Sequence, residues 1–284
     1  SGSNFQFSIN ENNWLGRGIN LASTLNISEE RISGNIAVTN PNYNYSGNAV
    51  STSLDVASTD RTSTTGYKSS STGFTLGTSF EQYERIYIAP TLSVSSEKIE
   101  AESTASSQIK KMAGSYFNSD LIYSVTLDKR DQSFQPREGY RASFTQSLPL
   151  VLDTSSIMNG VNFSSYNDFT EDIIGSIKLY ARSIHGVNDD VRLTKRLFIP
   201  SNKLRGFVRG KVGPKDGIDW VGGNYITAIS VEAALPNLLP ESTKTDISIF
   251  LDTANLWHVD YSDTLEDANK IRSSLGIAAN VYST

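Results

Sequence analysis

Basic side chains gather in one glycine-punctuated stretch, KLRGFVRGKVGPKDGIDWVGGN, at residues 203–224. It places Lys203, Arg205, Arg209 and Lys211 between two segments with strand patterns. Arginine suits the binding of carboxylates, because its planar fork can form two parallel hydrogen bonds and its charge persists at all physiological pH values. A loop of this length inside a compact β domain is usually functional or disordered. The stretch is therefore the first candidate for a site.

Two carboxylates are the candidate partners of this loop. In 224–235 the large apolar residues are mostly odd-numbered, so Glu232 lies on the opposite face of a strand. In 245–253 the same parity places Asp252 on that opposite face. Neighbouring strands thus present two carboxylates on one side, where Arg205 of the intervening loop can reach them. The alternative is that Arg205 is a solvated loop cation and that both carboxylates only keep a surface polar.

Other residues that could do chemistry lack the partners that chemistry needs. The chain has no cysteine, which excludes thiol catalysis and thiolate metal sites. His185 and His258 lie in turn-like stretches and are predicted to be surface residues. The serines have no G-x-S-x-G elbow around them, and VGGN (221–224) precedes no helix, so it is no phosphate cradle. We expect no catalytic residues, no metal, no cofactor and no enzymatic activity.

Two acidic stretches have simpler interpretations. Residues 128–138 combine aspartates, arginines and a glutamate, and we interpret them as a salt-bridge network of a hairpin rather than an acid–base site. The run DYSDTLEDANK (260–270) is predicted to be a solvated extracellular loop, with weak binding of divalent cations as the alternative.

Composition narrows the class of protein. The 284 residues carry a net charge of −5, which gives no nucleic-acid signature. No run approaches the ~18 consecutive apolar residues that a membrane helix needs. This test does not detect a transmembrane β-barrel. Its spanning segments of about ten residues alternate between apolar and polar side chains and look polar overall.

Alternation with period two runs through almost the whole chain and predicts about fourteen strands. The predicted strands include 5–10, 19–27, 31–40, 48–58, 85–94, 121–130, 140–148, 161–170, 173–182, 191–199, 224–235, 245–253 and 271–282. A soluble sandwich or jelly roll would bury the apolar faces, whereas a membrane barrel points them at lipid. Long strands with polar opposite faces favour the barrel. No shift in composition divides 1–284, so we predict a single barrel domain.

Several motifs that occur in a fixed order make this sequence resemble a known protein family. They are NNWLGRG (12–18), VTNPNY (38–43), LDKRDQSFQPREGYRASFT (127–145), LRGF (204–207), VGGN (221–224) with SVEAALP (230–236), and FLDTANLW (250–257). Together they resemble the barrel of the BamA family and of its wider superfamily of translocation-assembly and two-partner-secretion transporters. The resemblance implies an all-β, sixteen-strand antiparallel barrel, integral to the bacterial outer membrane.

The resemblance also assigns roles to the basic loop. In that family the long loop after the eleventh strand folds back into the barrel, and its arginine meets acidic residues on the lumen wall. Here this implies that Arg205 binds Glu232 and Asp252. Gly206 would let the backbone approach the wall closely, and Phe207 would fill an adjacent apolar gap.

Two departures from the family shape our expectations of the chain. No segment of 1–284 resembles the family's POTRA domains, and 272–284 align where we expect the family to continue with a Pro-Gly-Pro turn and two closing strands. We therefore expect an incomplete barrel with about fourteen of sixteen strands. The first strand would form a lateral seam, with the residues Phe5, Gln6, Phe7, Ser8, Ile9 and Asn10.

The function implied by the resemblance is the insertion of β-barrel proteins into the outer membrane. The implied partners are unfolded outer-membrane β-barrel clients, the lipoproteins of the BAM complex and outer-membrane lipid, with no nucleic acid. The alternative is a polypeptide-translocating outer-membrane pore of the translocation-assembly or two-partner-secretion type.

Overall fold

One antiparallel sheet makes up most of the computed structural model, which describes residues 4–151 and 155–281. Thirteen strands follow one another in the sheet in sequence order. These strands are β1 (Asn4–Trp14), β2 (Ile19–Ser28), β3 (Arg31–Asn40), β4 (Ala49–Arg61), β5 (Tyr67–Tyr83), β6 (Ile86–Ala101), β7 (Gly114–Asp128), β8 (Gly139–Pro149), β9 (Ser155–Thr170), β10 (Ile173–Val187), β13 (Tyr225–Leu235), β14 (Thr245–Trp257) and β15 (Arg272–Val281).

The remaining elements are short and lie in the connections. They are η1 (Tyr43–Tyr45), α1 (Thr62–Thr65), α2 (Ser107–Lys111), η2 (Leu193–Lys195), η3 (Glu241–Thr243) and the small hairpin β11 (Lys215–Asp216) with β12 (Asp219–Trp220). Within the described ranges, no helix is both long and apolar enough to cross a membrane. The largest connection, residues 188–224 between β10 and β13, is called the long loop below.

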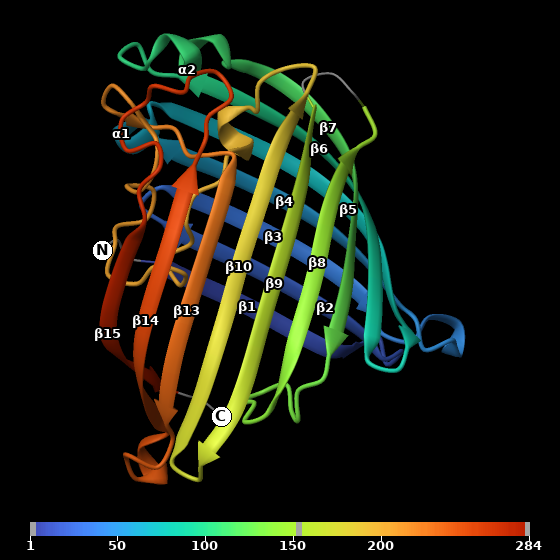
Figure 1. Cartoon of the computed structure of the whole chain (residues 1–284). Helices are drawn as coiled ribbons and strands as arrows, with labels where there is room; N and C mark the ends of the chain where they lie inside the picture. The colour runs from blue at the N-terminus through green and yellow to red at the C-terminus, as the bar shows by residue number, and fades with distance from the viewer. Residues whose placement is uncertain (1–3, 152–154, 282–284) are drawn as a thin grey trace.

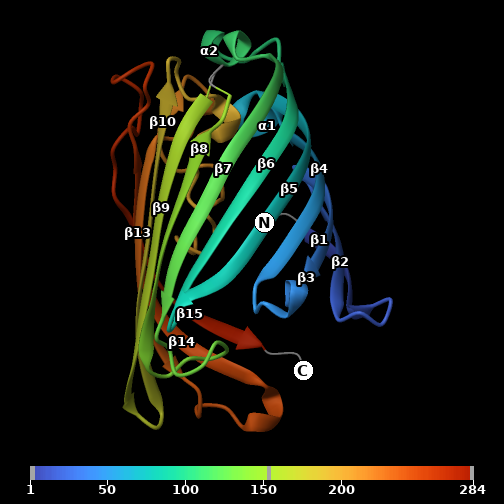
Figure 2. The same cartoon turned by 90° about the vertical axis from the view of Figure 1, so that its right-hand side faces the viewer.

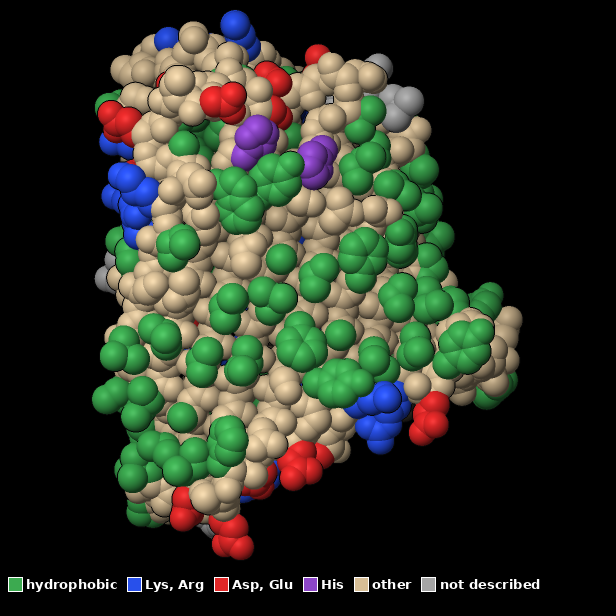
Figure 3. Space-filling model, in the orientation of Figure 1, with side chains coloured by type: hydrophobic (Ala, Val, Ile, Leu, Met, Phe, Trp, Pro, Cys, Tyr) green, Lys and Arg blue, Asp and Glu red, His purple; other side chains and the backbone are tan. Residues whose placement is uncertain are grey.

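The apolar faces of the strands point outward. Six large aliphatic residues on the last three strands are 44–76% exposed: Ile229, Val231, Ile249, Leu251, Leu275 and Ile277. Ser230 and Asp252, which alternate with them, are buried. On one outer face, hydrophobic side chains spread between the two ends, where Asp and Glu side chains are seen (Figure 3). The barrel prediction is confirmed, because a sandwich would have buried these aliphatic residues.

The sheet curls around an interior as the wall of a barrel (Figures 1 and 2). Strands β1–β6 lie across the interior from β8–β14 (Figures 1 and 2). In the described sheet, β1 pairs only with β2, and β15 pairs only with β14.

An apolar cluster closes one end of the barrel. It joins strand ends, α2, the long loop and the β14–β15 connection through seven buried residues: Tyr67, Ile99, Ala105, Ile109, Leu193, Val221 and Val259. The connections at this end thus hold one another in place and position the long loop above the interior.

The strand prediction was wrong at two places. Residues 191–199 contain η2 and extended backbone rather than a sheet strand, because this segment turns inside the barrel. Strand β5 was not among the predicted strands, since its start, YKSSST, is dominated by small polar residues. The long loop follows the tenth strand of the described sheet, whereas the family order suggested the eleventh.

Candidate functional site

Arg205 binds the inner wall of the barrel through Asp252. Its Nε and Nη2 donate to the two carboxylate oxygens of Asp252 at 2.7 and 2.8 Å, and its backbone N–H donates to the same carboxylate at 3.0 Å. Asp252 is 0% exposed, whereas Arg205 keeps 25% of its side chain exposed. The predicted ion pair is therefore present, in the bidentate geometry that an arginine fork favours.

Two further residues complete this group, which we call the clasp (Arg205, Ser230, Glu232 and Asp252). Ser230 pairs with Asp252 across β13 and β14, donates to Asp252 at 2.6 Å and accepts from Arg205 at 3.1 Å. Glu232 lies 3.5 Å from Arg205 and 3.5 Å from Lys178 of β10. Strand pairing thus fixes the positions of the acceptor side chains on β13 and β14, and the long loop supplies Arg205 as the donor.

The residues around the clasp act partly as predicted. The Arg205 guanidinium lies 3.4 Å from the centre of the Phe250 ring, a cation–π contact. Phe207 packs against a buried apolar cluster that includes Leu204 and Leu256. The role expected for Gly206 was wrong: an added Cβ would meet only one atom, at 4.0 Å. Glycine is favoured there because φ is +86°.

A second arginine of the long loop binds the opposite wall. Arg192 lies 3.5 Å from Glu97 of β6, donates to Asn118 of β7, and stacks 4.4 Å from the centre of the Tyr116 ring. Burial lowers the pKa of Arg192 from its ordinary value, while Glu97 opposes that shift. Lys195 adds an ion pair to Asp120 at 3.5 Å.

A third arginine binds the loop to the connection after β14. Arg196 pairs with Asp260 and also donates to Asn224 at 3.1 Å. Burial raises the pKa of Asp260, but the Val191 N–H and the charge of Arg196 outweigh it and hold the carboxyl below its usual range. The acidic stretch 260–270 therefore contains a structural anchor, and is not only a solvated loop.

These contacts make the long loop a strap across the interior, fixed to β6 and β7 on one side and to β14 on the other. The sequence prediction found Arg205 but missed Arg192 and Arg196. Both lie in the segment that was predicted as a strand. The signal that could have found them is their density, since VRLTKR holds three of the chain's 25 basic residues in six positions.

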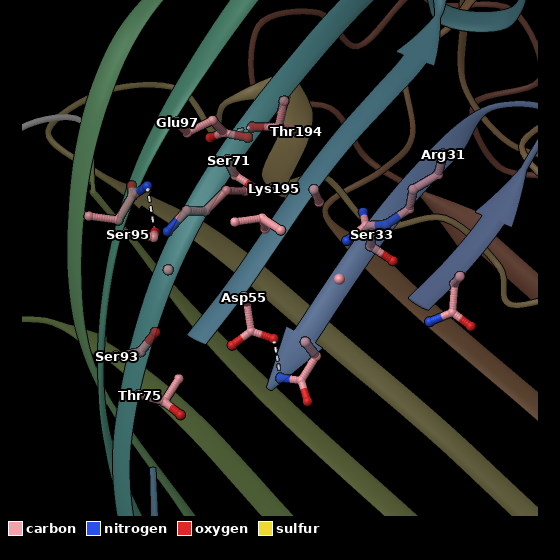
Figure 4. Close-up of a pocket in the computed structure, with 17 residues that line it drawn as sticks. Arg31, Ser33, Asp55, Ser71, Thr75, Ser93, Ser95, Glu97, Thr194 and Lys195 are labelled. Carbon is pink, nitrogen blue, oxygen red and sulfur yellow. Dashed lines mark hydrogen bonds between the residues drawn. The ribbon is translucent and has the colours of Figure 1, made fainter. Parts of the chain in front are cut away.

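Beside the strap, the interior is polar. A cavity of about 510 Å³ lies against the inner face of β3–β7 and is lined mainly by hydroxyl, amide and charged groups. Figure 4 shows Asp55, Ser71 and Ser93 on this wall, with Thr194 and Lys195 of the long loop beside Glu97. Thr194 donates to Glu97 at 3.1 Å.

The predicted seam residues lie in the first part of β1, far in sequence from the clasp. All eleven residues of β1 are exposed. Phe5, Phe7 and Ile9 share one face, and their paired residues in β2 include Leu25 and Ile27. The intervening residues Gln6, Ser8 and Asn10 share the other face.

The remaining candidates lie apart from both groups. Asp128 binds Arg130 at 2.7 Å within the predicted hairpin, whereas Arg137 binds Asp168 of β9, outside that hairpin, at 2.8 Å, so the predicted network is present only in part. His185 was predicted in a turn but lies in β10, where Nε2 is 2.8 Å from the Tyr225 hydroxyl. In the described part of the chain, no three His, Cys, Asp or Glu side chains are grouped to hold a metal ion.

Comparison with known proteins gives a family and several relatives. A model described as the Omp85 superfamily domain matches residues 13–283. The chain is 28% identical over 217 residues to the outer membrane protein assembly factor BamA of Neorickettsia risticii, a match that covers 74% of this chain and 29% of that protein. A SAM50-like protein of Schizosaccharomyces pombe is 30% identical over 140 residues, covering 46% of this chain and 30% of that protein. The chain thus spans less than a third of either relative.

Solved structures match over almost the whole chain. BamA from Haemophilus ducreyi lacking POTRA domains 1–3 superposes with a TM-score of 0.83 at 20% identity, covering 99% of this chain and 62% of that one. CdiB from Acinetobacter baumannii superposes less well, with a TM-score of 0.60 at 11% identity, covering 97% and 50% of the two chains. At these identities the likeness shows the fold, which is closer to BamA than to CdiB.

Proposed function

Because this chain belongs to the Omp85 superfamily, with a barrel of the BamA type, we propose that it acts as an insertase for other β-barrel proteins. It is an integral protein of the bacterial outer membrane. The single observation that carries the proposal is the fold, which superposes on the BamA barrel with a TM-score of 0.83 and on the CdiB barrel with a TM-score of 0.60. The similarity to BamA of Neorickettsia risticii supports it.

In this proposal the mechanism is strand templating at the edge of β1 that faces away from β2. In lipid no water satisfies free backbone N–H and C=O groups, and each unsatisfied group costs several kcal/mol. Such an edge is also a template, because an incoming strand can add to it through main-chain hydrogen bonds largely without regard to sequence. A client strand that pairs with Phe5–Asn10 would keep its own backbone satisfied while it enters the membrane. Insertion of this kind requires no catalytic residue.

The strap has a complementary role in this proposal. Its contacts to β6 and to β14 join two opposite walls of the barrel. With those walls held, the sheet can part beside β1 without losing the arrangement of the rest. The clasp is thus proposed to keep the barrel in the shape in which β1 is accessible.

The proposed partners follow from the same mechanism. They are unfolded outer-membrane β-barrel clients, which pair with β1, and outer-membrane lipid, which covers the apolar outer face. Lipoproteins of the BAM complex are proposed partners because of the similarity to BamA.

Site-specific crosslinking tests the template. A cysteine at Ser8 is expected to crosslink to the last strand of a stalled client, as is a cysteine at Gln6. The matched control is a cysteine at Thr24, which pairs with Ser8 but lies on β2, a strand with partners on both sides. Equal crosslinking at Ser8 and Thr24 would show that clients do not use the edge.

The alternative is a polypeptide-translocating pore, which the weaker likeness to the CdiB structures supports. The strap argues against it, because ion pairs fix the loop across the interior. Single-channel conductance separates the two functions. A pore gives large, steady conductance in the wild-type chain, whereas an insertase with a strapped interior gives little conductance and accelerates client folding.

A further inference from the structure

A second group of cations lies inside the barrel beside the clasp. Lys178, Tyr180 and Arg182 alternate along β10 and share its inward face, opposite the buried Ser230 of β13. Lys203 of the long loop meets them there. Its Nζ lies 5.6 Å from the centre of the Tyr180 ring, and Cζ of Arg182 lies 4.2 Å from the same centre.

The charges of this region do not balance. Lys178 shares Glu232 with Arg205, and Arg205 also binds Asp252. Among the described residues, neither Arg182 nor Lys203 has a carboxylate within 4.0 Å. Four cations thus face two carboxylates, an excess of two positive charges in a chain whose net charge is −5.

Arg182 is held in place by neutral groups. It donates to the carbonyls of Val161 and Ala181 at 3.0 and 2.8 Å, and to the side-chain oxygen of Asn162 at 3.2 Å. Gly160, its cross-strand partner on β9, makes room for it, because an added Cβ would lie 2.8 Å from the guanidinium. The charge is therefore positioned in advance and not neutralised.

Burial and neighbouring positive charges destabilise the charged form of Lys203. Burial lowers the pKa of Lys203, and the charges of Lys178 and Arg182 lower it further, while Asp252 opposes them. An anion placed between Lys203 and Arg182 would relieve this repulsion. The side chain of Lys178 is 35% exposed, so the group is open to the interior.

We propose that Lys178, Arg182 and Lys203 form a binding site inside the barrel for a phosphate group. A phosphate monoester carries a charge of about −1.5 to −2 at pH 7, which matches the excess of two positive charges. Arginine can donate two parallel hydrogen bonds to phosphate, and lysine adds point charges. The phosphate can come from free inorganic phosphate or from a lipid with a monoester headgroup.

Titration calorimetry with inorganic phosphate tests the site. The full chain is folded in a neutral detergent without phosphate. We expect saturable binding at one site per chain, and each of Arg182→Gln and Lys203→Gln should weaken it at least tenfold. Lys211→Gln is the matched control, since Lys211 is an exposed cation of the same loop, and it should leave binding unchanged. Arg182→Lys keeps the charge and should restore part of the affinity.

Folding of each variant is checked by its heat-modifiable mobility on gels, so that a loss of binding is not a loss of the barrel. Absence of phosphate binding to the wild-type chain would overturn the site, as would equal binding by all variants. Tighter binding of acetate than of phosphate would overturn the phosphate assignment. Short-chain phosphatidic acid, compared with short-chain phosphatidylcholine, shows whether a lipid monoester occupies the same site. No client is present, so the result does not depend on the proposed insertase function.

Discussion

Replacing Arg205 with alanine is expected to release the long loop from the β13–β14 wall. The change removes the two side-chain hydrogen bonds to Asp252, at 2.7 and 2.8 Å, and leaves this fully buried carboxylate with Ser230 and a backbone N–H as donors. Stranding one partner of a buried pair costs ~3–5 kcal/mol. Arg205 is 25% exposed, so the lower end applies, at about 3 kcal/mol. A factor of ten in an equilibrium constant is about 1.4 kcal/mol, so the undocked fraction should rise about 100-fold.

Hydrogen exchange of the backbone amides of residues 201–212 measures this fraction directly. Arg209→Ala is the matched control, because Arg209 is exposed and has no carboxylate within 4.0 Å among the described residues. Lys203→Ala should loosen the loop less than Arg205→Ala does. Arg205→Ala should also impair client assembly more than Lys203→Ala does. Adding Asp252→Asn to Arg205→Ala should recover part of the loss, because the uncompensated charge is then removed. Equal exchange in Arg205→Ala and Arg209→Ala would refute the reasoning.

Three further changes test the barrel, the strap and its anchors. Leu251→Lys introduces a charge on the lipid face and should lower the free energy of unfolding by ~2–4 kcal/mol in urea titrations in lipid vesicles; an unchanged midpoint would contradict the membrane orientation. Gly213→Ala should destabilise the loop more than Gly210→Ala, since φ is positive at both but only the Cβ at 213 would lie 2.4 Å from a side chain of β14; equal trypsin cleavage rates would contradict this. Because the pKa of Asp260 is lowered in the folded protein, its stabilising contribution is present above its unfolded value and is lost as pH falls through its folded value. Exchange of the loop should therefore rise in acid, with the Asp260 step missing in Asp260→Asn.

Much of the fold followed from alternation alone. The outward faces of β13 and β14 were predicted correctly, because successive side chains of a strand point to opposite faces and the apolar residues keep one parity. The alternation also predicted the two carboxylates of the clasp, because it placed Glu232 and Asp252 on the face opposite the outward apolar residues.

The sequence predictions were wrong where tertiary contacts override the local alternation of apolar and polar residues. The segment 191–199 alternates like a strand but contacts no sheet neighbour in register; its arginines are drawn to Glu97 and Asp260 instead. No local signal in the sequence identifies those two carboxylates, which lie about 100 residues upstream and 64 residues downstream of their arginines. The role of Gly206 depends on a positive φ, and the sequence alone does not distinguish that need from close approach.

The central claim is that clients are inserted by pairing with the edge of β1 that faces away from β2, and locking that edge tests it most directly. The lock is a disulfide from Ser8→Cys to a cysteine in the closing strand of the sixteen-strand barrel that the family resemblance implies, and gel mobility verifies that the fold is intact. The rate at which a client barrel folds into vesicles containing the chain is then compared in the locked and the reduced forms. We predict that the locked form loses the acceleration and that reduction restores it. If the locked form assembles clients at the rate of the reduced form, β1 is not the template.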